Sequence, residues 1–173
     1  MIQMREKNLP DKELLERARK MRLWTRRTAT LLIINDRPDI ARLVEADGVH
    51  LGQNDLPVRE ARRILGPEAL IGVSTHNLEQ VRQAVLDGAS YIGVGPTFPS
   101  LTKEFNELAG LDFVREALAV TSIPAFVIGG VNAKTIADVV LAGGSRVAVS
   151  AVISNSESPR ATAAVLRDAL SMG

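Results

Sequence analysis

The sequence contains no cysteine, and among its 173 residues only two are histidine, one is tryptophan and one is tyrosine. The absence of cysteine excludes disulfide bonds, thiolate metal sites and a cysteine nucleophile. No apolar run reaches the roughly 18 residues that a membrane-spanning helix needs, and the N-terminus has no signal-peptide pattern. We therefore expect a cytoplasmic protein without a membrane partner.

An excess of charge of one sign is also missing. Lys and Arg total 21 against 20 Asp and Glu, which gives a formal net charge of +1. This balance provides no general attraction to nucleic acid or acidic membranes. The basic stretch from Arg17 to Arg27 includes Trp24, but a solvated helix face explains it and no recognition motif accompanies it. A nucleic-acid binder is therefore the least favoured alternative.

Short apolar runs alternate with amphipathic segments along the whole chain. The runs are unbroken, as expected for strands that are buried on both faces of a parallel sheet. They predict strands over Ile2–Met4, Leu31–Ile34, Val49–Leu51, Leu70–Val73, Tyr91–Val94, Ala125–Ile128 and Val147–Val149.

The segments between these runs have helical spacing and helix-boundary residues. Asp11 is predicted to cap the first helix, and Pro57 suits the first turn of a helix that ends at Gly66. Later helices are predicted to end at Gly88 and Gly143.

This alternation predicts one α/β domain over residues 1–173 with parallel strands, either doubly wound or closed into a barrel. We favour a TIM-type (β/α) barrel because polar residues follow most strands, and a barrel collects all of these strand ends on one face. Seven of the usual eight strand–helix units are visible.

Two carboxylates follow neighbouring predicted strands. Asn35 and Asp36 come after one strand, and Asp55 comes after the next. Adjacent strand ends would let the two carboxylates share a magnesium ion, which often takes one or two protein carboxylates together with water and phosphate oxygens. The alternative is that both are turn residues or helix caps.

Glycines and a serine follow two later strands. Gly129 and Gly130 come directly after one strand, and Ser150 follows the next. Backbone N–H groups at such glycines can approach a phosphate closely, although a tight turn with positive φ explains them equally well. The chain has neither a GxGxxG sequence nor a P-loop.

The segment from Gly95 to Lys103 carries hydroxyls and an ammonium after a strand. Ser100, Thr102 and Lys103 suit a diphosphate, whose developing charge they would stabilise. A stiff, long loop of this kind often acts as a lid, while an exposed polar loop is the simpler interpretation.

Gln3, Arg5 and Lys7 occupy alternate positions at the N-terminus. On a strand their side chains would point to one side. Charges facing a barrel interior need an anion or a partner, and a frayed N-terminus is the alternative.

The motifs together resemble those of the thiamine phosphate synthase family. The segments that carry this resemblance occur in one order, namely Gln3–Lys7, Ile34–Arg37, Ala46–Gln53, Gly72–His76, Gly95–Lys103 and Ile128–Gly130. The resemblance implies a (β/α)8 barrel, of which this chain is expected to lack the first strand–helix unit. It also implies a magnesium-dependent transferase that joins hydroxymethylpyrimidine diphosphate to thiazole phosphate, giving thiamine phosphate and pyrophosphate.

The resemblance also implies roles for individual residues. It implies magnesium ligation by Asp36 and Asp55, and catalysis by Lys103, Arg5, Lys7 and Ser74. The implied substrate contacts are Gln3, Asn35, Ser100, Thr102, Gly130 and Ser150.

Two alternatives stay open beside the synthase. One is a thiazole tautomerase-type paralogue on the same barrel, and the other is a non-catalytic binding protein for thiamine precursors. The expected partners are small-molecule substrates and, where chains assemble, further copies of this chain.

Overall fold

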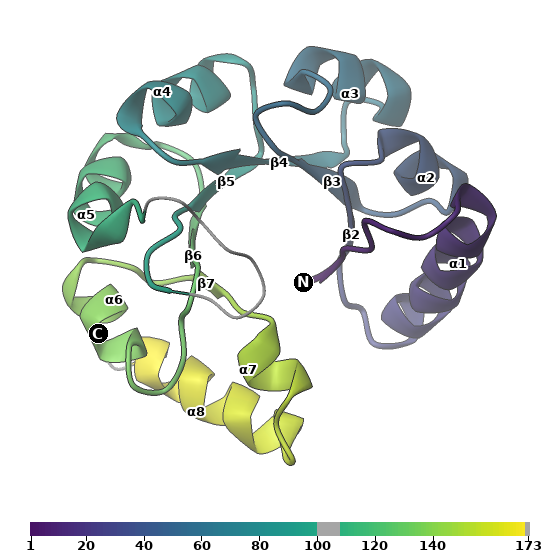
Figure 1. The fold of residues 1–173 in the computed structure, drawn as a ribbon. Helices are drawn as coiled ribbons and strands as arrows, with labels where there is room; N and C mark the ends of the chain where they lie inside the picture. The colour runs from purple at the N-terminus through teal and green to yellow at the C-terminus, as the bar shows by residue number, and fades with distance from the viewer. Residues whose placement is uncertain (100–107, 172–173) are drawn as a thin grey trace. The chain divides into compact units, whose positions relative to one another are not determined.

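The computed structural model describes residues 1–99 and 108–171. Its strands are β1 (Ile2–Met4), β2 (Leu32–Asn35), β3 (Gly48–Leu51), β4 (Leu70–Thr75), β5 (Tyr91–Val94), β6 (Ala125–Ile128) and β7 (Val147–Ala148) (Figure 1). Its helices are α1 (Asp11–Arg27), α2 (Pro38–Leu43), α3 (Val58–Leu65), α4 (Leu78–Leu86), α5 (Gly110–Val120), α6 (Ile136–Leu141), α7 (Ala151–Ser154) and α8 (Pro159–Ser171).

The chain packs into two compact units. The first unit comprises Met1–Ser74 and Asp87–Tyr91, and the second comprises Thr75–Leu86 and Ile92–Gly173. Each unit contains parallel strands and the helices that pack on them.

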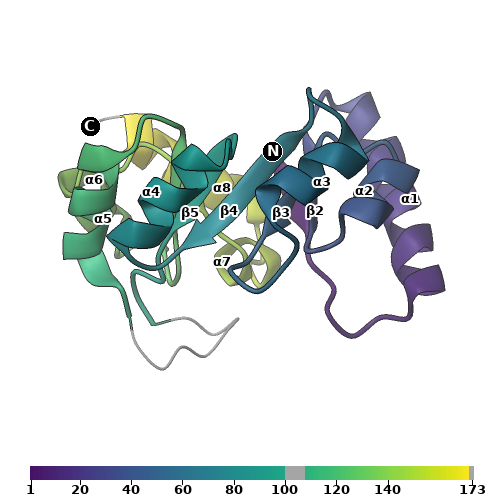
Figure 2. The same cartoon turned by 90° about the horizontal axis from the view of Figure 1, so that it is seen from above.

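In the first unit, strands β1 to β4 pair in parallel and in sequence order. Helices α1, α2 and α3 lie along one side of these strands (Figures 1 and 2). Ile33, Val49 and Ile71 lie on neighbouring strands and are fully buried. The predicted unbroken apolar strands are therefore confirmed here, because the three successive apolar side chains of β2, Leu32, Ile33 and Ile34, are all buried.

In the second unit, β5, β6 and β7 pair in parallel. Helix α5 packs against α4 and α6, and α8 packs against α6 and α7. Val94, Val114, Val127 and Val139 form the fully buried centre of this unit. The predicted boundaries of β5 and β6 agree with the structure at both ends.

One local expectation is wrong. Helix α1 begins at Asp11 itself, Pro10 occupies the cap position, and no side chain caps the helix. Asp11 instead accepts a hydrogen bond of 2.6 Å from Arg37. Strand β1 covers Ile2–Met4 as predicted, so Arg5 and Lys7 follow the strand and only Gln3 lies on it.

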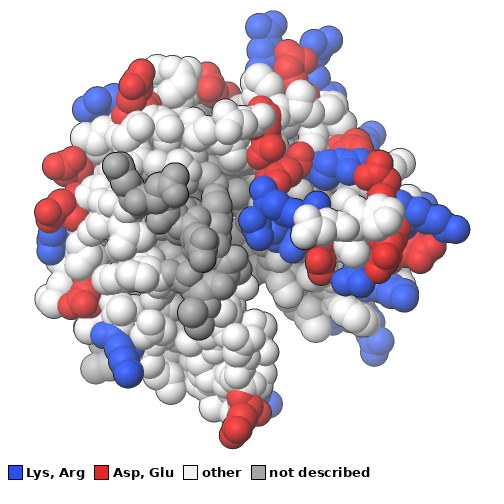
Figure 3. Space-filling model, viewed as in Figure 1, with Lys and Arg blue, Asp and Glu red and all other residues white. Residues whose placement is uncertain are grey.

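The basic stretch predicted as a solvated helix face lies on α1, where Arg17, Arg22 and Arg26 are paired with acidic side chains. Arg17 pairs with Glu13, and Arg22 pairs with Asp47, each at 2.7 Å. In Figure 3, blue and red atoms are intermixed over α1 and α2. Separately, no helix within the described ranges is both long and apolar enough to cross a membrane.

Candidate active site

The two predicted carboxylates lie together in the first unit. Asp36 follows β2 and Asp55 follows β3, and their carboxyl groups are close enough to share a hydrogen bond. Asp36 has a φ of 63°, in the left-handed region that Asp tolerates better than most residues. Its backbone N–H donates to the carbonyl of His50 at 2.8 Å. The paired strands thus turn Asp36 toward Asp55.

Burial, together with this contact, controls the protonation of Asp36. Burial and the neighbouring Asp55 raise the pKa of Asp36 above its ordinary value of 3.8, while Lys7 opposes that rise. Lys7 Nζ lies 3.3 Å from Asp36 Oδ2. One oxygen of Asp55 accepts a hydrogen bond of 2.6 Å from the backbone N–H of Gly52. The pair therefore has fixed geometry and excess negative charge that a cation would neutralise.

A pocket of about 180 Å³ adjoins Asp36. Arg37 at its rim donates to Asp39 and to Asp11, each at 2.6 Å, and these carboxylates raise the pKa of Arg37. Arg37 is thereby engaged in ion pairs, whereas Lys7 faces Asp36. The lining residues are Glu6, Lys7, Leu9, Leu14, Asn35, Asp36 and Arg37.

The acidic pair does not enclose a metal ion by itself. Among residues 1–99 and 108–171, no group of three or more His, Asp or Glu side chains could hold one. Two carboxylates would leave the other coordination positions of a metal ion to water or to substrate phosphate oxygens. This suits magnesium, which usually keeps such ligands in its shell. The donor set therefore fits magnesium bound together with a phosphorylated substrate.

Ser74 belongs to a second polar cluster in the first unit. His50 Nε2 lies 2.9 Å from Ser74 Oγ, and His50 Nδ1 lies 3.2 Å from the Tyr91 hydroxyl. Gln53 Nε2 donates to the Ser74 carbonyl at 2.6 Å. Sequence reasoning did not assign His50 or Tyr91 to the site. His50 lies in the segment Ala46–Gln53, but its contact with Ser74 depends on the pairing of β3 with β4.

Burial controls the charge of this cluster. Desolvation lowers the pKa of His50 to about 4, although Asp55 opposes that shift. Desolvation also raises the pKa of Tyr91. Near neutral pH the cluster therefore consists of neutral, hydrogen-bonded groups.

The remaining N-terminal candidates lie on or directly after β1 and at the end of β2. Gln3 is on β1, in register with Ile33, and Arg5 follows the strand. Both side chains are exposed. Asn35 ends β2 in register with His50.

Gly129 and Gly130 follow β6 in the second unit, with φ values of 97° and 66°. A Cβ on Gly130 would lie 2.3 Å from the carbonyl oxygen of Pro99 and 2.8 Å from the Cβ of Phe98. Thr97 also holds the segment after β5 close to the end of β6, since its backbone N–H donates to the Ile128 carbonyl at 2.9 Å. The glycines therefore accommodate the chain that follows β5, and their phosphate role stays a prediction.

Ser150 directly precedes α7, with an exposed side chain that makes no capping hydrogen bond. His76 Nδ1 lies 2.6 Å from the Gly95 carbonyl, next to the cis Gly95–Pro96 peptide bond. The predicted residues Ser100, Thr102 and Lys103 lie outside the described residues.

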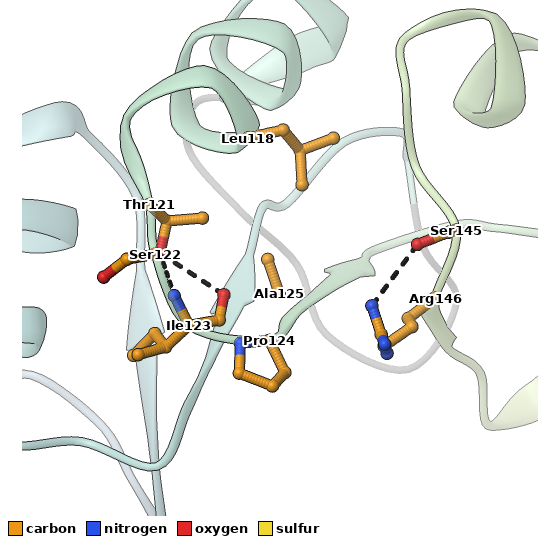
Figure 4. Close-up of a pocket in the computed structure, with 8 residues that line it drawn as sticks. All are labelled: Leu118, Thr121, Ser122, Ile123, Pro124, Ala125, Ser145 and Arg146. Carbon is orange, nitrogen blue, oxygen red and sulfur yellow. Dashed lines mark hydrogen bonds between the residues drawn. The ribbon is translucent and has the colours of Figure 1, made fainter.

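A larger pocket of about 340 Å³ lies at the beginning of β6 and β7, the opposite strand ends from Gly129 and Ser150 (Figure 4). Sequence reasoning singled out none of its residues. They are Leu118, Thr121, Ser122, Ile123, Pro124, Ala125, Ser145 and Arg146.

Comparison with known proteins identifies close relatives. The thiamine-phosphate synthase of Synechococcus sp. (strain CC9311) is 46% identical over 170 residues, which cover 98% of this chain and 48% of that protein. The thiamine-phosphate synthase of Gloeobacter violaceus is 42% identical over 173 residues, covering 100% of this chain and 51% of that protein. The chain thus spans about half the length of these relatives.

A solved structure agrees with them. Thiamine phosphate pyrophosphorylase from Pyrococcus furiosus superimposes with a TM-score of 0.89 at 34% identity, covering 98% of this chain and 82% of that chain. This match confirms the α/β, TIM-type fold with parallel strands that the sequence predicts. Residues 1–153 match the sequence pattern of thiamine monophosphate synthases. The chain therefore belongs to the thiamine monophosphate synthase family.

Proposed function

We propose that this chain is a transferase that condenses hydroxymethylpyrimidine diphosphate with thiazole phosphate to form thiamine phosphate and pyrophosphate. The observation that carries the proposal is the contact between Asp36 and Asp55, with Lys7 3.3 Å from Asp36 Oδ2. This arrangement of two carboxylates and an ammonium suits a diphosphate bound together with a divalent cation. The family membership supports the same substrates.

In this proposal Asp36 and Asp55 hold magnesium. A bound magnesium ion would neutralise charge on the departing diphosphate. The bond between the pyrimidine methylene carbon and the diphosphate oxygen breaks, and its electron pair leaves with pyrophosphate. The thiazole nitrogen then forms the new bond to that carbon.

The chain's own residues position the reactants. They also exclude water from the pyrimidine carbocation that is left when the diphosphate departs. Lys7, Arg5 and Asn35 contact the diphosphate, Gln3 contacts the pyrimidine, and Ser74 donates to the leaving group. Gly130 and Ser150, in the second unit, hold the thiazole phosphate. Ser100, Thr102 and Lys103 complete the proposal as loop contacts, with Lys103 acting on the departing pyrophosphate.

The cytoplasmic location and the assembly of chains into homo-oligomers stay predictions. The tautomerase-type alternative needs no diphosphate apparatus, so the pair of Lys7 with Asp36, whose carboxyl also contacts Asp55, favours the synthase. A non-catalytic binding protein would retain ligand-induced stabilisation without turnover.

The test is formation of thiamine phosphate from the two precursors by the folded 173-residue chain. We expect product with magnesium, none with excess chelator, and recovery when magnesium is restored. A folded chain that yields no product under saturating substrates and magnesium contradicts the proposal. A rise in melting temperature with the precursors in that case would identify the binding-protein alternative.

A further inference from the structure

The register of β3 and β4 places a histidine beside a serine. His50 pairs directly with Gly72. Because alternate side chains of a strand share a face, Ser74 lies on the same face of β4 as Gly72. This explains why His50 Nε2 reaches Ser74 Oγ at 2.9 Å.

Gly72 leaves room for the third member of the cluster. A Cβ at Gly72 would lie 2.1 Å from Cζ of Tyr91 and 2.5 Å from its hydroxyl oxygen. The Tyr91 ring therefore occupies the space above Gly72, with its centroid 5.5 Å from that of His50. The hydroxyl of Tyr91 then meets His50 Nδ1 at 3.2 Å. Gly72 on β4 and the buried ring of Tyr91 thus fix the imidazole of His50.

The direction of these hydrogen bonds decides what Ser74 can do. A neutral imidazole has one N–H donor and one nitrogen acceptor. If Nδ1 carries the proton, the Ser74 hydroxyl must donate to Nε2, and its proton is no longer available to a ligand. If Nε2 carries the proton, it donates to Ser74 Oγ and leaves the serine O–H free.

The chemistry of the hydroxyls favours the second arrangement. A phenol is more acidic than an aliphatic hydroxyl, so Tyr91 is the stronger donor of the two and suits the imidazole lone pair. An anionic diphosphate oxygen accepts hydrogen bonds and cannot donate them, so Ser74 can assist it only with a free O–H.

We propose that His50 and Tyr91 are positioning residues that orient Ser74 as a hydrogen-bond donor: the Tyr91 hydroxyl donates to His50 Nδ1, and His50 Nε2–H donates to Ser74 Oγ. The identification of the ligand of Ser74 as an anionic diphosphate rests on the proposed function. The orientation of the hydrogen bonds rests on the contacts of His50 with both hydroxyls and on the stronger donor character of the Tyr91 phenol. Sequence motifs assign neither His50 nor Tyr91 this task.

The tautomer can be measured without any activity. Long-range ¹H–¹⁵N correlation spectra of the ¹⁵N-labelled chain at neutral pH report which imidazole nitrogen is protonated. The sequence has two histidines, so His76→Gln assigns the remaining signal to His50. We expect a neutral ring with the proton on Nε2. A proton on Nδ1, or a charged ring, overturns the proposal.

A double-mutant cycle tests the functional consequence. Tyr91→Phe removes the hydroxyl, and we expect kcat to fall about tenfold with a smaller change in KM. In a Ser74→Ala background the same change should have almost no effect on kcat, because its target is absent. Melting temperatures of all four proteins identify losses that arise from unfolding.

An equal fall in kcat in both backgrounds would show that Tyr91 does not act through Ser74. An unchanged kcat for Tyr91→Phe beside an active parent chain would also reject the positioning role. An inactive parent chain rejects the proposed function instead, and the tautomer measurement then decides the hydrogen-bond directions alone.

Discussion

Lys7 Nζ lies 3.3 Å from Asp36 Oδ2, while the Asp36 carboxyl also contacts that of Asp55. One ammonium cannot balance two carboxylates, so burial and Asp55 together still raise the pKa of Asp36. The three groups come from the segments that follow β1, β2 and β3. Strand pairing therefore brings together two carboxylates whose negative charge a divalent cation would neutralise.

Asp36→Asn is expected to lower turnover by about tenfold or more and to raise the magnesium requirement, because loss of a carboxylate weakens the cation site. Steady-state rates of product formation across a magnesium titration measure both effects. Asp112→Asn is the matched control, since Asp112 is an exposed residue of α5 paired with Arg115. Equal magnesium dependence in both variants would remove Asp36 from the cation site.

The same substitution should stabilise the metal-free protein at neutral pH. The folded-state pKa of Asp36 is raised, so the folded protein binds a proton more tightly than the unfolded chain. With chelator present, this group lowers the free energy of unfolding as pH rises from 3.8 through its folded pKa. Urea unfolding of Asp36→Asn should lack that decline, and an identical pH profile would contradict the raised pKa.

His50 should make the fold sensitive to mild acid. Its pKa falls from 6.5 to about 4 on folding, so the unfolded chain binds a proton that the folded protein excludes. The free energy of unfolding should therefore decrease as pH drops through this window, by at most about 1.4 kcal/mol per pH unit. His50→Gln should flatten this segment of the urea-unfolding profile, whereas His76→Gln should retain it. Parallel profiles for the two variants would contradict the buried neutral histidine.

Arg22→Ala is expected to destabilise the first unit by about 3 kcal/mol. Asp47 Oδ2 accepts from Arg22 and from the backbone N–H of Leu32, each at 2.7 Å, and the two side chains of the pair are only 17% and 25% exposed. Removing the guanidinium leaves the Asp47 charge without its cation. Arg17→Ala breaks exposed pairs with Glu13 and Glu6 and should cost less than about 1 kcal/mol. Chemical denaturation measures both, and equal losses would show that Arg22 contributes only as a surface residue.

Gly130→Ala should disturb the chain after β5 more than Gly143→Ala does. Both glycines have positive φ, so each substitution carries backbone strain of about 1 kcal/mol. At Gly130 the new Cβ would also press on the Pro99 carbonyl at 2.3 Å, whereas at Gly143 the nearest atom of Leu118 is 3.8 Å away. A larger loss of melting temperature for Gly130→Ala is expected. Equal losses would show that φ alone explains the effect.

Hydropathy predicted where the strands lie more accurately than where each one ends. The expected strand Leu31–Ile34 is shifted by one residue, because the β2 ladder runs from Leu32 to the polar Asn35, which pairs with His50. Leu31 is 44% exposed although it is apolar. Apolar character predicts the burial of a strand as a whole, while hydrogen bonding with the neighbouring strand determines its boundary.

The sequence by itself determined the alternation of strands and helices, and it placed Asp36 and Asp55 directly after neighbouring strands. These features depend on local residue order, which periodicity and motifs record. Only the tertiary structure decided that the Asp36 carboxyl meets that of Asp55, and that His50 meets Ser74 and Tyr91. Strand register brings together groups that are up to 41 positions apart, and burial then changes their pKa values, because desolvation depends on what surrounds a group in space.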